Sequence, residues 1–259
     1  MSRRRLPVSG VEVELRQPAG RADILLAEAT AYDVDLALTL IGYVARPVPG
    51  PRVDWAALPH TDVDALVLLA RQAVFGDLVR ATVRCPLPEC GVPFSVGFST
   101  ELYLDHHRPR PASGVVSDDR AGWFRLATAP VRFRIPVASD IVAATAAPRP
   151  DQTLLGRCAE PAPLSGPLRR RVERAMARLA PSLVDDLAGQ CPDCRTTVTM
   201  HFDPISFCLA ELSHQAASVF EDVHLIASVY HWTEAQILAL PRRRRTLYAE
   251  LARAERRTA

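Results

Sequence analysis

Two short cysteine motifs decide how this chain folds: Cys85-Pro86-Leu87-Pro88-Glu89-Cys90-Gly91 and, roughly a hundred residues later, Cys191-Pro192-Asp193-Cys194. Each motif is a knuckle, a tight turn that places two thiols on the same side. A tetrahedral Zn²⁺ ion needs four ligands, so two knuckles brought together in space would complete a site. We therefore expect one zinc ion that joins two distant segments and is held by Cys85, Cys90, Cys191 and Cys194.

An alternating run typical of a β-strand follows each motif: Phe94–Phe98 after the first and Val198–Phe202 after the second. Two knuckles on adjacent strands form a zinc ribbon. Two other interpretations remain open, namely four reduced buried thiols or two local disulfides. A disulfide across either knuckle would close a very short loop, and no apolar run typical of a signal peptide follows Met1–Arg5. These features favour a reducing compartment and a zinc site.

The expected zinc is structural, because four cysteine ligands leave no coordination position for water or substrate. Such a site contributes about 10–16 kcal/mol of apparent folding free energy in small zinc modules. The first knuckle has four residues between its cysteines and the second has two, so Cys90 and Cys85 are the weaker half of the prediction. Cys158 and Cys208 have no partner at ligand spacing and lie in apolar stretches. Both are predicted to be buried core residues.

The composition is that of an ordinary globular protein. The 259 residues are 48% hydrophobic and 23% charged, and 31 basic against 29 acidic residues leave a net charge of +2. Every basic residue is Arg, since the chain contains no Lys. A charge this small provides no broad electrostatic surface for nucleic acid or an anionic membrane. No stretch approaches the ~18–20 apolar residues of a membrane span, and we expect a cytoplasmic protein.

The predicted fold class is α+β, mainly helical, with a small antiparallel zinc-ribbon-like β module formed by the two distant knuckles. Residues 1–20 are expected to be a flexible N-terminus or short strand, with a strand at Val11–Leu15. The other predicted parts are an N-terminal helical part (21–80), the zinc-ribbon-like module (81–107 and 190–203), an insertion with a β-hairpin and helices (108–189) and a C-terminal helical part (204–259).

Several elements can be predicted inside these parts. Ala22–Val44 has helical spacing and predicts a helix or a helix pair, and Thr61 or Asp62 is expected to cap a helix that ends at Phe75. Phe124–Leu126 and Val131–Ile135 predict the hairpin of the insertion, and Ser182–Leu187 predicts a short helix.

The C-terminal part has the clearest periodicity. Apolar residues recur at spacings of three and four from Ile205 to Tyr230, which predicts one helix of about seven turns. Asp203 is its expected N-cap, with Pro204 in the first turn. Thr233 and Gln236 form a predicted capping box for a following short helix.

A run of four arginines begins the last predicted helix, Arg242–Arg256. Four cations at a helix N-terminus oppose the macrodipole, so solvent, acidic partners or a function must offset them. Three interpretations are open: a solvated face partly neutralised by Glu234, Glu250 and Glu255, a docking site for a protein, or a nucleic-acid site that stacks on Trp232 and Tyr248. The predicted partner-binding residues are Tyr230, Trp232, Arg242, Arg243, Arg244 and Arg245.

Motifs typical of enzymes are missing from the sequence. There is no Gly-rich phosphate loop, no Gly-x-Ser-x-Gly and no His-Glu-x-x-His. The acidic pairs Asp118-Asp119 and Asp185-Asp186 are adjacent, so their side chains diverge. We therefore expect no enzyme and no small-molecule substrate. A weaker alternative is a metal-dependent hydrolase that uses His201 and Asp203 beside the metal.

The order of the motifs resembles the T4-type phage baseplate hub assembly chaperone family, over roughly residues 20–255. The most telling part is Tyr230-x-Trp232-x-Glu234 followed by Leu240-Pro241 and the Arg-rich helix. The other segments that carry the resemblance are Thr61–Leu66 through Phe75–Asp77, both cysteine motifs, Phe133–Pro136 with Ser139-Asp140, Leu154–Cys158, Phe202–Pro204 and Asp222–Ala227.

The resemblance implies a non-enzymatic assembly factor or minor component of a contractile tail or injection-system baseplate hub. Its partners would be hub or spike proteins, and the protein would act in the cytoplasm or be incorporated in a phage tail-like particle. The alternative is a zinc-ribbon nucleic-acid-binding regulator, which would share the knuckles and the Arg helix. Charge disfavours a nucleic-acid partner, because Glu89 and Asp193 accompany Arg84 and Arg195 beside the cysteines.

Overall fold

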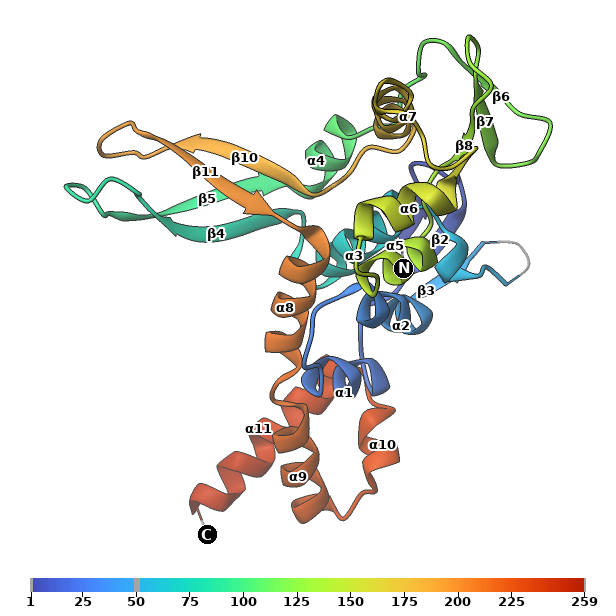
Figure 1. Ribbon diagram of the computed structural model, residues 1–259. Helices are drawn as coiled ribbons and strands as arrows, with labels where there is room; N and C mark the ends of the chain where they lie inside the picture. Colours follow the sequence, from blue (N-terminus) through green and yellow to red (C-terminus); the bar gives the residue numbers. More distant parts are fainter. Residues whose placement is uncertain (1, 49–51, 259) are drawn as a thin grey trace.

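The computed structural model describes residues 2–48 and 52–258. It is a mixed α+β fold, as predicted. Helices form the central body, and the strands form small antiparallel sheets. Figure 1 shows two β-hairpins extending to one side of this body, a further sheet above it, and the C-terminal helices below it.

The described strands form four sheets. They are β1 (Ser2–Arg5), β2 (Glu12–Leu15) and β3 (Ala45–Pro47); β4 (Leu78–Arg84) and β5 (Pro93–Ser99); β6 (Val115–Ser117), β7 (Trp123–Leu126), β8 (Arg132–Arg134) and β9 (Ala159–Glu160); and β10 (Asp185–Gln190) and β11 (Thr197–Phe202).

The helices lie between and after these strands. They are α1 (Arg21–Ala27), α2 (Val34–Val44), α3 (His60–Phe75), α4 (Thr100–His106), α5 (Ala138–Thr145), α6 (Pro150–Cys158), α7 (Gly166–Leu179), α8 (Pro204–Ala216), α9 (Val219–Tyr230), α10 (Glu234–Leu238) and α11 (Arg242–Thr258), with a short 3₁₀ turn, η1 (Trp55–Ala57). The predicted helix pair over Ala22–Val44 is confirmed as α1 and α2.

Helix α3 is the centre of the main core. All of its residues from Thr61 to Arg71 are buried, and α2, α4, α5 and α8 pack around it. A helix that is apolar on most sides can be stable only inside a protein. The surrounding core includes Leu40 and Ile41 of α2 and Leu209 and Leu212 of α8, which are fully buried.

The expected capping roles of Thr61 and Asp62 are wrong, because the N-cap of α3 is Pro59. The Thr61 hydroxyl instead donates to the Pro181 carbonyl at 2.8 Å. The Asp62 carboxylate accepts from the backbone N–H groups of Val8 and Ser9, each at 2.8 Å. These side chains tie α3 to distant loops, and the Asp62 contacts fix the turn between β1 and β2.

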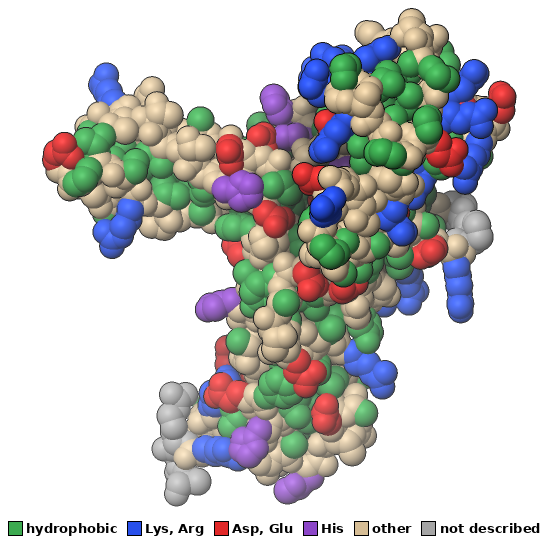
Figure 2. All heavy atoms as spheres, viewed as in Figure 1, with side chains coloured by type: hydrophobic (Ala, Val, Ile, Leu, Met, Phe, Trp, Pro, Cys, Tyr) green, Lys and Arg blue, Asp and Glu red, His purple; other side chains and the backbone are tan. Residues whose placement is uncertain are grey.

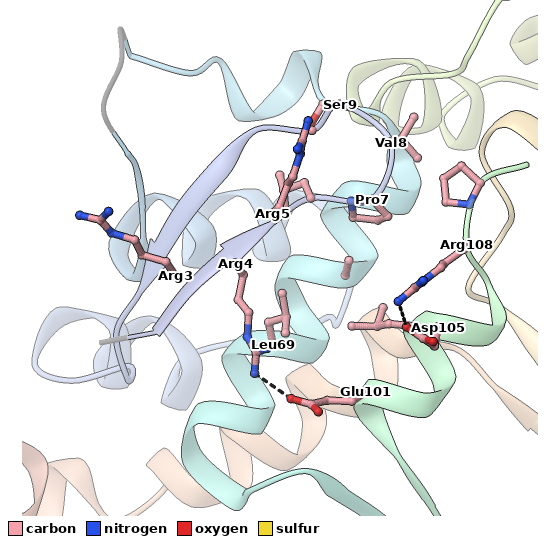
Figure 3. A pocket seen from close by; sticks show the side chains of 15 residues that line it. Arg3, Arg4, Arg5, Pro7, Val8, Ser9, Leu69, Glu101, Asp105 and Arg108 are labelled. Carbon is pink, nitrogen blue, oxygen red and sulfur yellow. Dashed lines mark hydrogen bonds and ion pairs between the residues drawn. The ribbon is translucent and has the colours of Figure 1, made fainter.

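The N-terminal strands also contact α4. Figure 3 shows Arg4 of β1 pointing toward Glu101, with 3.0 Å between Nη2 and Oε1, while Arg108 pairs with Asp105. The predicted strand at Val11–Leu15 is confirmed as β2, which lies between β1 and β3 in the sheet. The structure therefore describes most of residues 2–20 as strand and turn.

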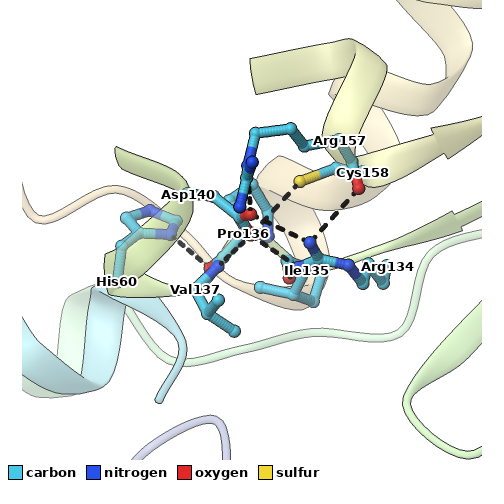
Figure 4. A network of polar contacts seen from close by, with 8 residues as sticks. All are labelled: His60, Arg134, Ile135, Pro136, Val137, Asp140, Arg157 and Cys158. Carbon is cyan, nitrogen blue, oxygen red and sulfur yellow. Dashed lines mark hydrogen bonds and ion pairs between the residues drawn. The ribbon is translucent and has the colours of Figure 1, made fainter. Parts of the chain in front are cut away.

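A buried aspartate joins three elements of the insertion, β8, α5 and α6, to one another. Asp140 of α5 is 1% exposed and receives hydrogen bonds from Arg134 of β8, at 2.5 and 2.9 Å, and from Arg157 of α6, at 2.8 Å (Figure 4). Burial acts to raise the pKa of Asp140, but hydrogen bonds from Arg134, the Val137 N–H and Arg157 outweigh it and lower the pKa to about 2. Cys158 lies in the same network, fully buried as predicted.

The hairpin predicted in the insertion is confirmed by β7 and β8, which pair as the central strands of a four-stranded sheet. The short helix predicted at Ser182–Leu187 is wrong, because β10 begins at Asp185 and pairs with β11 along its whole length. A short helix has little intrinsic stability in water, so a cross-strand partner decides the conformation of such a segment. That partner lies more than ten residues later in the chain and leaves no local signal.

The single helix predicted from Ile205 to Tyr230 is also wrong. This segment forms two helices, α8 and α9, which are separated by a turn at Ala217 and Ser218. The apolar spacing continues across the break, since Ala216 and Val219 are both buried. However, α8 packs against α1 and α3, whereas α9 packs mainly against α10 and α11. The expected N-cap of α8 at Asp203 and the capping box of α10 at Thr233 and Gln236 are confirmed.

The arginine run at the start of α11 is divided between the interior and the surface. Arg245 is 2% exposed, and its Nη2 lies 2.6 Å from Oδ2 of Asp23, which is fully buried. Arg242 also pairs with Asp23, and Arg245 Nε lies 3.6 Å from Asp222 Oδ2. The four arginines are therefore not one exposed patch, because residues three apart share the buried side of the helix.

The acidic partners that offset the arginines are Asp23 and Asp222, which the sequence analysis did not identify. Arg243 and Arg244 are exposed, and within residues 2–48 and 52–258 their side chains have no ion pair. Of the four arginines predicted to bind a partner, only Arg243 and Arg244 are therefore exposed and unpaired among the described residues.

We expect Arg245→Ala to destabilise the protein by about 3–5 kcal/mol, because it removes the buried cation that Asp23 and Asp222 share and leaves each carboxylate with one less buried partner, Arg242 or Arg253. The matched control is Arg243→Ala, an exposed position in the same helical turn, for which a change within about 0.5 kcal/mol is expected. Urea unfolding followed by circular dichroism measures both. Equal midpoints for the two variants would contradict the structural role of Arg245.

Candidate metal centre

The two cysteine motifs lie at the tips of two β-hairpins. Strands β4 and β5 pair over seven residues each, and Cys85 and Cys90 stand in the connection between them. Strands β10 and β11 pair over six, and Cys191 and Cys194 stand in theirs. Figure 1 shows the two hairpins side by side, with both tips at the same end. Segments a hundred residues apart thus deliver their thiols to one place.

The two tips share a turn geometry. In each, the residue after the second cysteine is left-handed, with φ 56° at Gly91 and φ 59° at Arg195. The N–H of that residue bonds the carbonyl four residues earlier, Leu87 at 2.9 Å in one tip and Cys191 at 3.0 Å in the other. When the two turns are aligned by these hydrogen bonds, Leu87 corresponds to Cys191. The first ligand of the first tip, Cys85, therefore lies two residues before the position that Cys191 holds in the second tip. The wider first spacing is therefore compatible with a shared site.

The four thiols form one cluster. Their sulfur atoms all lie within 4.8 Å of one another, with 3.5 Å between Cys85 and Cys194 and 3.8 Å between Cys90 and Cys191. A disulfide bond is about 2.05 Å long, and all six cysteines are free, so the two local disulfides considered above are absent. Four ligands at the usual Zn–S distance of about 2.3 Å stand about 3.8 Å apart in a tetrahedron. The observed spacing fits that geometry.

The cluster has its own small apolar surrounding. Cys85 and Cys191 are 5% and 1% exposed, and they pack with Val198 and the half-buried Val83, Leu87 and Phe94. Cys90 is half-buried and Cys194 is exposed. Among the described strands, no backbone pairing joins the β4–β5 sheet to the β10–β11 sheet. Contacts among side chains, and a shared metal, are what can hold the tips together.

The thiols differ in acidity. Hydrogen bonds from the side chain and backbone of Thr196 lower the pKa of Cys194 to about 6. The Leu87 backbone N–H acts to lower the pKa of Cys85, but desolvation and the neighbouring thiols outweigh it and raise that pKa to about 12. Without a cation, the cluster can therefore lose its first proton near neutral pH but not all four. A divalent metal would have to displace the remaining protons.

Other residues considered in the sequence analysis lie elsewhere. His201 is 68% exposed and its Nδ1 lies 2.9 Å from Asp186, four strand pairs from the tip of the β10–β11 hairpin. Asp203 caps α8. In the part of the chain that the structure describes, the only group of His, Cys, Asp and Glu atoms close enough to hold a metal is the four cysteines. The hydrolase hypothesis therefore lacks the arrangement it requires.

The aromatic residues of the predicted partner surface contact one another. Tyr230, Trp232 and Tyr248 form a triangle with ring centroids 5.1 to 5.6 Å apart, and all three are half-buried. They pack against the small core formed by Ile226, Ile237 and Ala249. Tyr230 and Trp232 thus stabilise the C-terminal helices, and only part of each ring faces solvent.

Comparisons with protein-family models, with curated proteins and with solved structures found no match. Within residues 2–48 and 52–258, no helix is both long enough and apolar enough to cross a membrane.

We expect protein purified without added metal to contain about one zinc ion per chain, measured by elemental analysis. Cys191→Ser should release that metal and expose both hairpins to proteolysis, because the metal joins segments far apart in sequence. Cys158→Ala is the matched control, since Cys158 is buried away from the tips, and it should retain the metal. A stable wild-type fold with four titratable thiols and no metal would contradict the site.

Proposed function

We propose that this protein is a non-enzymatic assembly factor or minor component of a contractile tail or injection-system baseplate hub, with a zinc-ribbon-like module stabilised by structural zinc. The observation that carries the proposal is the four-thiol cluster at the tips of two projecting hairpins. Four thiolate ligands complete the coordination of Zn²⁺, so a metal bound there would shape a surface and would have no position left for substrate.

The extent of the molecular surface supports a binding role. The accessible surface is 14723 Å², whereas a compact monomer of 28.4 kDa is expected to expose about 11,000 Å². The hairpins project from the body (Figure 1), as an extended shape with extra surface requires. An excess of this size exceeds the area that a typical protein–protein interface covers. An extended shape of this kind suits a protein that contacts large partners.

The hairpin arm offers an apolar surface for such contacts. A cavity of about 460 Å³ lies between the two hairpins and is lined mainly by apolar side chains, including Phe94, Phe98 and Leu187. On the face shown in Figure 2, hydrophobic and uncharged atoms cover most of the arm, with charges of both signs near its tip. A mixed and sparse charge supports a protein partner over nucleic acid, which requires a basic surface.

The resemblance of the motifs to the baseplate hub assembly chaperone family supports a hub or spike protein as the partner. The second predicted contact surface comprises the exposed Arg243 and Arg244 at the start of α11, and Trp232 and Tyr230, which contact Tyr248 of the same helix. Arginine and aromatic residues are enriched among interface hot spots. Arg242 and Arg245 contribute to this surface by holding α11 in place through Asp23.

We expect the double variant Arg243→Ser/Arg244→Ser to fold normally and to lose co-purification with hub or spike proteins encoded nearby, by at least tenfold. The matched control is Arg170→Ser/Arg174→Ser, an exposed arginine pair on α7, which should keep the partner. Tagged protein expressed with those partners, followed by mass spectrometry, measures the recovery. Retained partner with loss of salt-dependent DNA or RNA binding would instead favour the regulator and reject the baseplate role.

A further inference from the structure

A second cavity lies in the main body, away from the cysteines. It has a volume of about 380 Å³ and is formed where the N-terminal ends of α2, α3, α5 and α8 meet the segment before β10. Its walls are mainly aliphatic and its polar groups are mainly acidic. The lining residues used below are Asp33, Val34, His60, Val63, Asp64 and Asp203.

Asp64 is the unusual group in this cavity. It is 6% exposed, and its carboxylate has no hydrogen bond or ion pair with any residue in the ranges 2–48 and 52–258. The two other carboxylates of the lining are already used as helix caps. Asp33 accepts from the Leu36 N–H at 3.0 Å, and Asp203 accepts from the Ile205 N–H at 3.0 Å. Buried carboxylates are normally paired, so Asp64 lacks a partner that the cavity has room to hold.

Among the described residues, no cationic side chain lines this cavity. Its lining contains neither Arg nor Lys, and its one basic group is His60. Desolvation lowers the pKa of His60, although the Pro136 carbonyl and Asp62 oppose the shift, so the imidazole is neutral at pH 7. Asp33 and Asp203 offset the positive N-terminal dipoles of the helices that they cap, α2 and α8. No cationic side chain among the described residues of the lining neutralises Asp64.

We propose that this cavity binds a primary ammonium group on an aliphatic stem, with the Asp64 carboxylate as its main contact and Asp203 beside it. The stem would lie against Val34, Val63 and the other aliphatic side chains of the wall. Because the chain contains no Lys, the ammonium must come from outside it. The two sources with this chemistry are a free alkylamine or polyamine and a lysine side chain of another protein.

Other ligand classes fit the cavity less well. An anion would meet three carboxylates. A divalent metal needs several oxygen ligands converging at about 2.0–2.6 Å, and among the described residues no metal-binding group other than the cysteines was found. The walls favour a ligand that carries both positive charge and an apolar body.

The ionisation of Asp64 gives this binding a characteristic pH dependence. Burial raises the pKa of Asp64 to about 7, and the neighbouring Asp203 adds to the rise. The other ionisable groups that face the cavity or Asp64 are Tyr32, Asp33 and His60 of the lining and, from α4 and α8, Tyr103 and Cys208. An ammonium ion favours the carboxylate, so its affinity should increase from pH 6 to pH 8 and its binding at pH 7 should release protons.

The test uses the full-length protein and isothermal titration calorimetry with n-butylamine, which is charged over this pH range. We expect saturable one-site binding that weakens at least tenfold when 1-butanol, a neutral ligand with the same stem, replaces the amine. Spermidine and Nα-acetyl-lysine methylamide distinguish the two sources, because the tighter ligand identifies a free polyamine or a lysine side chain. No saturable binding of any amine at millimolar concentration would overturn the proposal.

The decisive variant is Asp64→Asn, which should lose amine binding at least tenfold. The control is Asp105→Asn, an exposed aspartate outside the cavity, which should bind as the wild type does. Folding is checked at the same time. A carboxyl whose pKa is raised on folding destabilises the native state as pH rises from about 4 to about 7, so Asp64→Asn should unfold at higher urea concentration at pH 8. Unchanged amine affinity in a folded Asp64→Asn protein would overturn the proposal.

Discussion

Four sulfur atoms within 4.8 Å of one another are the constraint on which the projecting part of this structure depends. Four thiolates so close together would repel one another. The four sulfur atoms can therefore lie together only if most of them are protonated or if they surround a cation. Each hairpin has only two strands, and an isolated two-stranded hairpin is marginally stable in water. The base of the arm is anchored by Phe202 and Tyr103 in the main core, but its tip has only a few apolar contacts. A bound metal would therefore stabilise the tip more than any side-chain contact there.

Away from the arm, buried carboxylates paired with arginine join parts of the chain that local structure would leave separate. Asp140 links the four-stranded sheet to α5 and α6, and Asp23 links α1 to α11. A guanidinium can satisfy two oxygen atoms at once, and it stays charged when buried. In a chain without lysine, every such connection is an arginine. The same feature makes Asp64 conspicuous, because it is a deeply buried carboxylate with neither an arginine nor another hydrogen-bond partner among the described residues.

Local signals in the sequence predicted much of the fold. The strands beside the cysteines, the hairpin of the insertion and the capping box at Thr233 each depend on residues close together in the chain. Errors occurred where a distant partner decided the outcome. The segment at Ser182–Leu187 became part of a strand because β11 pairs with it, and the helix after Ile205 was broken because its two halves join different cores. Periodicity reports an apolar face but does not report which neighbour covers it.

The candidate site followed the same pattern. Ligand type and spacing were sufficient to identify the four cysteines, whose proximity the structure confirms. The arginine run was recognised, but spacing alone could not reveal that Arg245 would turn inward to meet Asp23, more than two hundred residues earlier. Asp64 gave no signal at all, because it is one acidic residue in an otherwise ordinary helix. Its isolation is a property of the assembled core.

The long separations have a consequence for the order of events during synthesis. The β4–β5 hairpin emerges with two cysteines, but its partners at Cys191 and Cys194 are translated roughly a hundred residues later. Asp23 is translated more than two hundred residues before Arg245. Folding that depends on contacts this distant in sequence is slow. A nascent chain would therefore carry two unmatched thiols while roughly a hundred residues are added, and an uncompensated aspartate while more than two hundred are added.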